Sequence, residues 1–327
     1  MYDSKEILDK VNHAVAHLSF DRKPEGLYEP IRYVLSLGGK RIRPVLMLMA
    51  YNMYKKDIEP CMPAAVALEV YHNSTLLHDD VMDKAMVRRG QPCVHVKWND
   101  NTAILSGDTM LLTAFRMMQD SPQGVMPKVL SLFTETTLLI DEGQQMDMDF
   151  ETCTDVTEEE YIEMIRLKTS VLLACAASLG AVQGGAKESD TKILYTFGEK
   201  LGLAFQLQDD LLDVYGNYAV FGKRIGGDIL ENKKTHLLIT ALQMADEEQR
   251  KELLRWMDES PTTEEAQQRK IDGVKALYDA IGVKSATEHR INEYFHEARM
   301  ALESLSVSIE KKTPLWEFAV SLMQRES

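Results

Sequence analysis

Aromatic residues are scarce in this 327-residue chain, at 7%, although hydrophobic residues of all kinds make up 45% and methionine occurs 18 times. A core of aliphatic and thioether side chains is typical of packed helices. Strand-like alternation is also nearly absent, so we expect an all-α bundle of long helices. Basic residues are in the minority, with 37 Lys+Arg against 51 Asp+Glu and a net charge of −14. This acidity argues against nucleic acid as the main partner.

Cysteines are few as well, and none of the 4 forms a C-x-x-C pair. Their wide spacing indicates buried or incidental thiols in a reducing compartment. The first residues, MYDSKEILDKVNHAV, are charged and amphipathic, which does not fit a signal peptide. The longest nearly apolar stretch, Val171 to Val182, is too short to span a bilayer. We therefore expect a cytoplasmic protein with no transmembrane segment.

No Pro/Gly/Ser-rich linker divides the chain, so we expect residues 1–327 to form one large domain, although they exceed the usual domain size. The most charged stretch, about 245–285, carries no motif, and we assign it to a peripheral helical hairpin. Apolar periodicity predicts helices near residues 4–20, 25–37, 41–55, 61–82, 99–119, 125–149, 157–184, 188–216, 227–245, 247–257, 262–283, 284–305 and 313–325.

One motif, D-D-x-x-D, occurs twice, each time at the end of an apolar run. On a helix its first and fifth positions point the same way and its second stands beside them. Such a carboxylate patch repels itself, and Mg²⁺ relieves the repulsion while it bridges carboxylates to substrate phosphates. A single cluster would more simply be a solvated helix end, but two copies followed by basic residues favour metal sites. The candidate metal ligands are Asp79, Asp80, Asp83, Asp209, Asp210 and Asp213.

Basic residues accompany the first cluster. Arg88 and Arg89 follow it at a turn, where guanidinium forks suit diphosphate oxygens, although a solvated charged loop is the alternative. The segment GGKRIRP opens a helix, and glycines before a helix start expose N–H groups at the dipole end that favours anions. Alone it is a weak phosphate motif; beside the first cluster it indicates a second anion pocket. Its candidate residues are Gly39, Lys40 and Arg43.

Other polar residues lie near the clusters. A lone histidine is more often structural, but His72 shares a helix face with Asp79, about two turns further on. After the second cluster, Lys223 and Lys233 could each neutralise a diphosphate. Lys168 and Thr169 open a run of small residues that either leaves room for a ligand or serves close helix packing, and Gln206 precedes the second cluster on its helix. No Ser-His-Asp pattern and no G-x-x-x-x-G-K-[ST] loop is present.

At these residues the chain resembles the trans-isoprenyl diphosphate synthases, the polyprenyl synthetase family. The shared motifs run from GGKRIRP through HNSTLLHDDVMDKAMVRRG, NTAILSGD, EGQQMD, LKTS and FQLQDDLLDVYG to FGKRIGGDILENKKT. They cover most of residues 30–240 in family order, and the terminal LWEFAVSLMQRES resembles the family's last helix. The resemblance implies an all-α isoprenoid synthase-type bundle around a central cleft, normally a homodimer.

The resemblance also implies an activity, that of a prenyltransferase of isoprenoid biosynthesis. Mg²⁺-assisted ionisation of an allylic diphosphate is followed by head-to-tail (1'-4) condensation with isopentenyl diphosphate, which releases pyrophosphate. The implied cofactor is Mg²⁺, three ions per active site. Asp79 and Asp83 on one wall and Asp209 on the other bind these ions, while Asp80, Asp210 and Asp213 assist beside them. Lys40, Arg43, His72 and Arg89 hold isopentenyl diphosphate; Arg88, Lys168, Thr169, Gln206, Lys223 and Lys233 contact the allylic substrate.

Product length is implied by the residues that precede the first cluster, because the growing tail runs beside that helix in the family. Farnesyl-forming relatives often have aromatics where this chain has Ser74 and Thr75. These small residues leave the upper channel open, and Tyr71 closes it about one turn, ~5 Å, deeper. We therefore predict a short or medium all-trans chain, with geranylgeranyl diphosphate ahead of farnesyl diphosphate.

Three other functions compete with this interpretation. A longer-chain polyprenyl diphosphate synthase would share every motif. A class I terpene cyclase usually has a mixed Asn/Ser/Glu set in place of the second D-D-x-x-D and lacks the GGKRIRP pocket, whereas this chain has both. A non-catalytic regulatory subunit would have lost aspartates or basic residues that are all present here.

Overall fold

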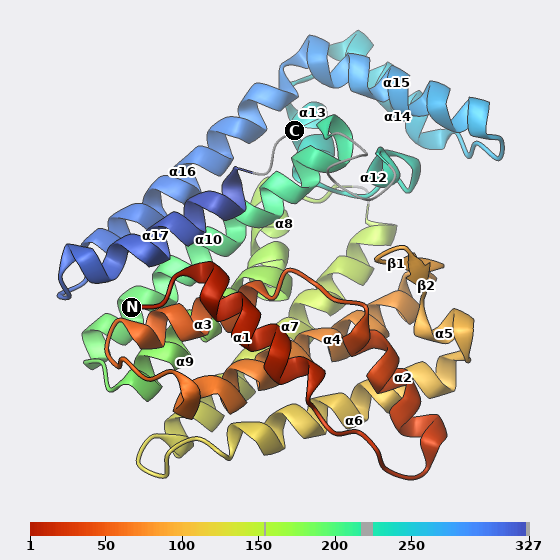
Figure 1. Ribbon diagram of the computed structural model, residues 1–327. Coiled ribbons are helices and arrows are strands. Elements are labelled where there is room, and N and C mark those ends of the chain that lie inside the picture. The colour runs from red at the N-terminus through yellow and green to blue at the C-terminus, as the bar shows by residue number, and fades with distance from the viewer. Residues whose placement is uncertain (154, 217–224, 325–327) are drawn as a thin grey trace. The chain divides into compact units, whose positions relative to one another are not determined.

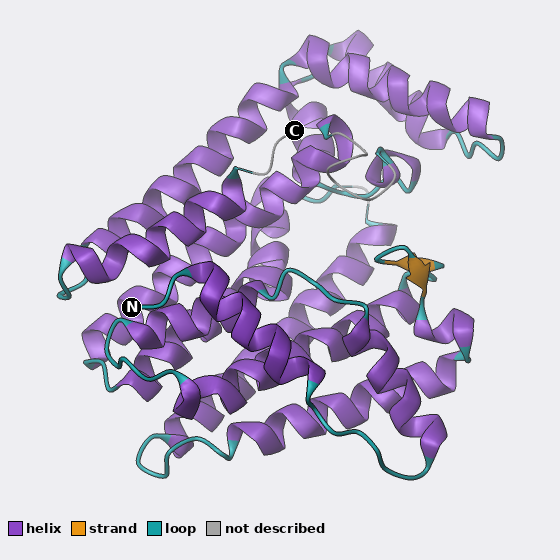
Figure 2. Ribbon diagram, in the orientation of Figure 1, coloured by secondary structure: helices purple, strands orange, loops and turns teal. Residues whose placement is uncertain are grey.

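The computed structural model describes residues 1–153, 155–216 and 225–324, and nearly all of its regular structure is helical (Figures 1 and 2). The all-α expectation is confirmed. Within those ranges the sheet content is one antiparallel hairpin of β1 (Val87–Arg88) and β2 (Gln91–Pro92). The helices are α1 (Ser4–Ala16), α2 (Glu25–Ser36), α3 (Ile42–Asn52), η1 (Glu59–Cys61), α4 (Met62–Met82), α5 (Val94–Lys97), α6 (Asp100–Met118), α7 (Met126–Thr152), α8 (Glu158–Ile165), η2 (Arg166–Ser170), α9 (Val171–Gly184), α10 (Glu188–Tyr215), α12 (Gly227–Leu230), α13 (His236–Met244), α14 (Glu247–Asp258), α15 (Glu264–Ile281), α16 (Val283–Glu303) and α17 (Ile309–Met323).

Backbone contacts divide the chain into two compact units. Unit 1 contains Met1–Glu135, Cys175–Tyr195 and Ser304–Phe318, and unit 2 contains Thr136–Ala174, Thr196–Glu303 and Ala319–Ser327. The helices α7, α9, α10 and α17 each supply residues to both units. The single domain expected over residues 1–327 stays a prediction.

In unit 1 the helix α4 packs against α3 and α6 (Figure 1). Its residues 64–71 are all buried, so it is enclosed on every side, as a helix apolar all round requires. The crossing with α6 is close, because a Cβ on Gly107 would lie 2.3 Å from Nε2 of His78. That ring nitrogen also lies 3.1 Å from the carbonyl oxygen of Ile104, so His78 has a structural role at the end of α4.

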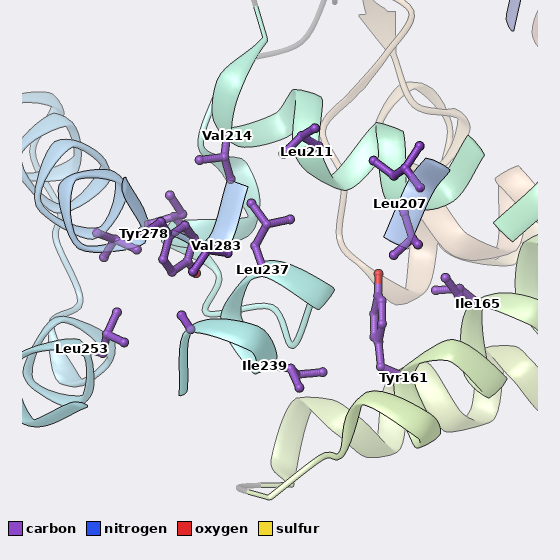
Figure 3. Close-up of a cluster of buried hydrophobic side chains, with 14 of the residues drawn as sticks. Tyr161, Ile165, Leu207, Leu211, Val214, Leu237, Ile239, Leu253, Tyr278 and Val283 are labelled. Carbon is purple, nitrogen blue, oxygen red and sulfur yellow. The ribbon is translucent and has the colours of Figure 1, made fainter. Parts of the chain in front are cut away.

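In unit 2 the second half of α10 forms the centre of an apolar cluster. Val214 lies near Leu237 of α13 and Tyr278 of α15, whereas Leu207 lies near Tyr161 and Ile165 of α8 (Figure 3). The predicted hairpin at 245–285 corresponds to α14 and α15. One face of α15 is buried in this cluster, so the charged hairpin contributes to the core of unit 2.

Two predicted helices are interrupted. Residues 157–184 form α8 and α9 with a turn of π-helix, η2, between them. Residues 227–245 form α12 and α13, separated by a segment in which Asn232 has φ 52°. Asparagine tolerates this left-handed conformation better than most residues, because its short side chain bonds locally. Helical periodicity does not report either interruption, since both keep the flanking residues helical.

The run Glu158–Gly184 is long and apolar enough to cross a membrane by length and composition. However, 83% of its most apolar window is buried within the protein. Core helices of soluble proteins meet the same criterion, so the run is weak evidence for a membrane span.

Candidate active site

The first aspartate cluster lies at the C-terminal end of α4, in unit 1. The N–H of Asp83, the C-cap residue, donates to the carbonyl of Asp79 at 2.8 Å, so the cluster stays on the last helical turn. Asp83 is exposed and Asp79 is half-buried, whereas only 3% of Asp80 is exposed. Asp80 turns inward because it stands about 100° round the helix from Asp79.

Arg88 is paired with the buried aspartate of this cluster. Its Nε and Nη2 lie 2.7 and 2.6 Å from Oδ1 of Asp80. Burial alone would lower the pKa of Arg88, but the hydrogen bond and the charge of Asp80 raise it above the ordinary value. Asp80 therefore fixes a permanently charged guanidinium beside Asp79 and Asp83.

A second group in unit 1 gathers arginines around His72. Gly38 (φ 76°) and Gly39 (φ 145°) adopt conformations that favour glycine just before α3. Arg89 donates from Nη1 to the carbonyl of Gly38, and a Cβ on Gly39 would lie 3.0 Å from Nη2 of Arg89. Burial first, and then the charges of four arginines, hold the pKa of His72 well below its ordinary value. A neutral imidazole among guanidinium groups is typical of an anion pocket. The four are Arg43, Arg89, Arg88 and Arg41.

Arg41 belongs to this group although the sequence pattern did not single it out. It is 5% exposed, has φ 50°, and its Nη1 lies 2.6 Å from Oε1 of Glu69 on α4. Asn73 also donates to that oxygen, at 3.0 Å. The buried ion pair fixes the GGKRIRP turn onto α4 near His72. Among three basic residues in one short run, nothing local shows which one is buried.

The predicted residues Lys40 and Arg43 lie on the same turn as Arg41. Lys40 is exposed and Arg43, in the first turn of α3, is half-buried. The structure therefore brings the basic residues predicted in unit 1 into one region around His72. Their roles in binding stay predictions.

The second aspartate cluster lines a cavity of about 230 Å³ in unit 2. Most residues predicted for this half of the site meet there, namely Lys168, Thr169, Gln206, Asp209, Asp210, Asp213 and Lys233. Lys223 lies outside the described residues. Cations and carboxylates thus face one cavity from α10, from η2 and from the segment after α12.

The π-helical turn η2 sets Lys168 and Thr169 at this cavity. Glycines flank the turn on two neighbouring helices, and both approach its backbone closely. A Cβ on Gly143 of α7 would lie 2.4 Å from the backbone nitrogen of Lys168, and one on Gly202 of α10 would lie 2.6 Å from Cα of Ser170. Ser170, the small residue after Thr169, therefore serves close helix packing. Lys168 and Thr169 themselves line the cavity. Such π-turns occur often at functional sites.

Hydrogen bonds link the polar groups round the cavity. Nζ of Lys168 donates to Oδ2 of Asp147 at 2.5 Å. Although burial would raise the pKa of Asp147, the charges of Lys233 and Lys168 bring it below the ordinary value. Thr169 Oγ1 donates to Gln206 Oε1 at 3.1 Å. The charges of Lys168 and Lys233, which come from two chain segments, thus both lower the pKa of Asp147.

Asp210 is the most buried member of the second cluster, at 5% exposure against 9% for Asp213. Both of its oxygens accept hydrogen bonds, Oδ1 from Gln206 Nε2 at 3.0 Å and Oδ2 from the hydroxyl of Tyr161. Figure 3 shows that hydroxyl pointing from α8 toward α10. Burial, followed by the charge of Asp228, raises the pKa of Asp210 to about 7. The hydrogen bonds from Tyr161 and Gln206 and the charge of Lys233 lower this pKa but do not outweigh the burial. Asp213 accepts the backbone N–H of Asp228 at 3.0 Å.

The cavity is also lined by four polar residues that the sequence did not single out as ligands: Asp147, Tyr161, Asp228 and Thr235. Asp147 is part of the motif EGQQMD but was given no role of its own. Tyr161 stands about two turns before Lys168, so helical spacing could have placed it on the same face. Asp228 and Thr235 belong to the interrupted helix, where a continuous-helix prediction gave no reason to choose them.

The residues proposed to set product length lie on α4. Tyr71 is 2% exposed, and its ring meets that of Phe133 edge-on at 5.3 Å between centroids. Phe133 in turn contacts Phe115 at 4.8 Å. The hydroxyls of Ser74 and Thr75 donate to α4 carbonyls at 2.6 and 2.9 Å. Three helices therefore supply an aromatic layer below two small residues.

No group of three or more His, Cys, Asp or Glu side chains in the described ranges is arranged to hold a metal ion by itself. The side chains at the cavity are nonetheless chemically suited to a hard cation, because their donors are carboxylate, amide and hydroxyl oxygens. Mg²⁺ commonly binds through one or two carboxylates together with waters and substrate phosphates.

Comparisons with known proteins define the class. The Polyprenyl synthetase family profile matches residues 24–273. A geranylgeranyl diphosphate synthase from Methanosarcina mazei is 42% identical over 73% of this chain and 75% of its own length. A geranylgeranyl pyrophosphate synthase from Geoglobus acetivorans is 39% identical over 97% of this chain and 96% of its own. A crystal structure of a geranylgeranyl pyrophosphate synthase superposes with a TM-score of 0.93 at 42% identity and covers 100% of both chains.

An all-α isoprenoid synthase fold with lysines and aspartates at one cavity defines an enzyme of prenyl transfer. The chain belongs to the polyprenyl synthetase family and is a trans-isoprenyl diphosphate synthase. Its activity is accordingly that of a prenyltransferase.

Proposed function

We propose that this synthase condenses isopentenyl diphosphate with allylic diphosphates and releases geranylgeranyl diphosphate. The observation that carries the proposal is the cavity of unit 2, where Lys168 and Lys233 face a ring of carboxylates. Fixed cations beside acidic metal ligands are what an allylic diphosphate requires, because charge accumulates on its oxygens as the C–O bond breaks.

Mg²⁺ is the cofactor that these residues would hold. Asp79 and Asp83 on α4 and Asp209 on α10 are the proposed ligands, since they are more exposed than Asp80 and Asp210. When bound, Mg²⁺ supplies positive charge that neutralises the diphosphate and stabilises the leaving pyrophosphate. Asp80 and Asp210 instead hold Arg88, Tyr161 and Gln206 in place.

The side chains divide the reaction between two substrates. Lys168, Lys233 and Arg88 attract the allylic diphosphate, whose C–O electron pair leaves with pyrophosphate. Arg89 and the neutral His72 lie in the pocket proposed for isopentenyl diphosphate, where its double bond is held close enough to form the new C–C bond. One proton is then lost to pyrophosphate, so the protein supplies no base.

The residues proposed to limit the length of the product lie on α4 and its neighbours in unit 1. Ser74 and Thr75 leave space beside α4, and the layer of Tyr71, Phe133 and Phe115 closes it below. The names of the M. mazei and G. acetivorans relatives agree with a geranylgeranyl product. A longer-chain polyprenyl product would require a passage through this aromatic layer.

The test is a product assay with purified protein, Mg²⁺ and isopentenyl diphosphate. Dimethylallyl, geranyl and farnesyl diphosphates are supplied separately, and the products are sized by mass spectrometry. We expect geranylgeranyl diphosphate from each primer. Farnesyl diphosphate alone, or chains beyond geranylgeranyl, would contradict the proposed length.

Both aspartate clusters are proposed to take part in ionising the same substrate. Asp79→Ala and Asp209→Ala should each lower the condensation rate roughly 10²- to 10³-fold, the usual effect of removing one stabilising group from a transition state. Asp120→Ala, at an exposed position after α6, is the matched control and should retain the wild-type rate. Near-normal condensation in either cluster variant would show that its metal-ligand assignment is wrong.

We further propose that the enzyme is a cytoplasmic homodimer. Its cysteines are free thiols, which supports a reducing compartment. On α6, Leu105 and Leu112 are 57% and 69% exposed and share one helix face, with the exposed Ile104 beside them. Contiguous exposed apolar residues of this kind mark interaction surfaces, and the family resemblance makes a second copy of the chain the occupant.

A further inference from the structure

Lys270 is a buried lysine in α15, outside the lining of the cavity. Only 1% of it is exposed, and its Nζ donates to Asn232 Oδ1 at 2.8 Å and to the carbonyl of Glu259 at 2.9 Å. In the part of the chain that the structure describes, no carboxylate lies within ion-pair distance of this ammonium. Burial lowers the pKa of Lys270 while the charge of Glu259 opposes this, and the two hydrogen bonds offset part of the cost of burying the ammonium.

The partner Asn232 stands at a special point of the backbone. It has φ 52°, and both ends of its amide are engaged, since Nδ2 donates to the carbonyl of Met257 at 2.8 Å. The next residue is Lys233, whose N–H donates to the carbonyl of Asp228 at 2.9 Å. The direction in which the chain leaves Asn232 therefore decides where Lys233 lies.

The same helix also contacts the start of this segment. Gly226, at φ 83°, precedes α12, and a Cβ there would lie 2.7 Å from the side chain of Ile271. From that point the backbone N–H groups of Gly226 and Asp228 reach Asp213, at 2.6 and 3.0 Å. Neighbouring residues of α15 thus touch both ends of segment 226–233, which carries Asp228 and Lys233 to the cavity.

The hairpin itself is tightly built at this place. A Cβ on Gly273 would lie 2.4 Å from the ring of Trp256, so α14 and α15 cross without space between them. That crossing fixes the carbonyls of Met257 and Glu259, which hold Asn232 and Lys270. A small cavity of about 20 Å³ beside Asn232 is lined by Leu253 and Met257 of α14 and Val274 of α15, and also by Asp228 and Lys233.

We propose that Lys270 is a positioning residue for the allylic-diphosphate half of the reaction. Through Asn232 it sets Lys233 and Asp228 at the cavity, so the charged hairpin acts on catalysis from outside the site. The inference rests on the proposed contact of Lys233 with the allylic diphosphate. Loss of the Lys270 ammonium should weaken that contact and leave the isopentenyl diphosphate pocket of unit 1 unchanged.

The test separates the two substrates by steady-state kinetics. Lys270→Met keeps the aliphatic stem and removes Nζ; we expect its KM for the allylic diphosphate to rise about tenfold, while the KM for isopentenyl diphosphate stays within about twofold of wild type. Asn232→Ala should have the same effect, and the double variant should be no worse than the more impaired single variant, because both remove one interaction. Lys251→Met, at an exposed position on α14, is the matched control and should match wild type.

A lower melting temperature alone does not support the proposal, because a structural lysine would give it as well. Unchanged KM values in a folded Lys270→Met variant, or equal rises for both substrates, would overturn it. If Lys270→Met does not fold, Asn232→Ala and Lys270→Arg give the same comparison, with partial recovery expected for arginine. Lys233→Ala separates the proposed contact of Lys233 with the allylic diphosphate from the positioning role of Lys270. A normal KM for the allylic diphosphate in Lys233→Ala would refute the contact. A raised KM in Lys233→Ala together with a normal KM in Lys270→Met would refute only the positioning role.

Discussion

At the scale of single residues, each D-D-x-x-D motif buries its second aspartate and leaves its first more exposed. The second aspartate of each, Asp80 and Asp210, is 3% and 5% exposed. Asp80 holds Arg88, and Asp210 holds Tyr161 and Gln206. The cause is the rotation of about 100° per residue, which turns the second position inward while the first stays at the rim. The buried aspartates therefore set the orientation of neighbouring side chains, among them Arg88 and Gln206, which are proposed to contact the allylic substrate.

The buried residue His236 leads to a prediction about how the stability of the protein depends on pH. It is 2% exposed, with Nδ1 3.0 Å from Thr287 Oγ1 and Nε2 3.6 Å from Glu158. Burial lowers its pKa below the ordinary 6.5, Glu158 opposes this, and Arg290 adds to it. As the pH falls below about 6.5, the unfolded chain gains a proton that the folded state resists, so the free energy of unfolding should fall.

Urea unfolding between pH 7.5 and 5.5 measures this effect. One proton limits the slope to about 1.4 kcal/mol per pH unit, and His236→Gln should show a shallower decline than wild type. Parallel declines in the two proteins would mean that His236 does not contribute to the loss of stability in acid.

Tyr71 gives the residue-scale prediction for product length. Tyr71→Ala removes the ring that covers Phe133, so we expect a shift toward products longer than geranylgeranyl diphosphate, measured by mass spectrometry. The empty space left by the missing ring should also lower the free energy of unfolding by about 3 kcal/mol or more. Phe133→Ala is the companion variant, expected to act in the same direction. If both fold by circular dichroism and still release the wild-type product, the aromatic layer does not set the length.

At the scale of elements, the π-turn η2 is the feature that departs most from a regular bundle. It carries Lys168 and Thr169 to the cavity, and Gly143 allows α7 to approach its backbone. We expect Gly143→Ala to push η2 outward, because its Cβ would lie 2.4 Å from the backbone nitrogen of Lys168. Stability should fall by roughly 1–3 kcal/mol, as overpacking typically requires, and the KM for the allylic diphosphate should rise.

A matched helix glycine provides the control for that prediction. Gly26 lies in α2, and a Cβ added there would meet nothing within 4 Å, so Gly26→Ala should be neutral or slightly stabilising. Thermal unfolding and substrate kinetics compare the two variants. Equal stability of both would show that η2 adapts to the added methyl group.

At the scale of the whole molecule, the proposed homodimer has its interface on the exposed apolar stripe of α6, formed by Leu105 and Leu112. Leu105→Glu combined with Leu112→Glu places charge on that stripe, and we expect sedimentation equilibrium to give a monomer where wild type gives a dimer. Leu254→Glu on α14, 46% exposed, is the control and should remain dimeric. A dimer that survives the double change would place the interface elsewhere.

Much of the fold could be predicted because helical periodicity is a local property. The ends of α4, α6 and α10 fall within one or two residues of their predicted positions, and the aspartates lie at the ends of α4 and α10 as expected. Asn232 and the turn η2 could not be predicted, since each depends on a partner far along the chain. Lys270 holds the first, and Gly143 and Gly202 make room for the second.

The sequence by itself determined the chemistry of this protein: two aspartate motifs on helices, the basic residues near them and the family to which they belong. Those features depend on residue type and short spacing, which folding does not change. Only the tertiary structure decided which charged side chains are buried and which line the cavity of unit 2. The pairs Arg41 with Glu69, Lys168 with Asp147 and Tyr161 with Asp210 are distant in sequence, and only the folded chain brings the two members of each pair into contact.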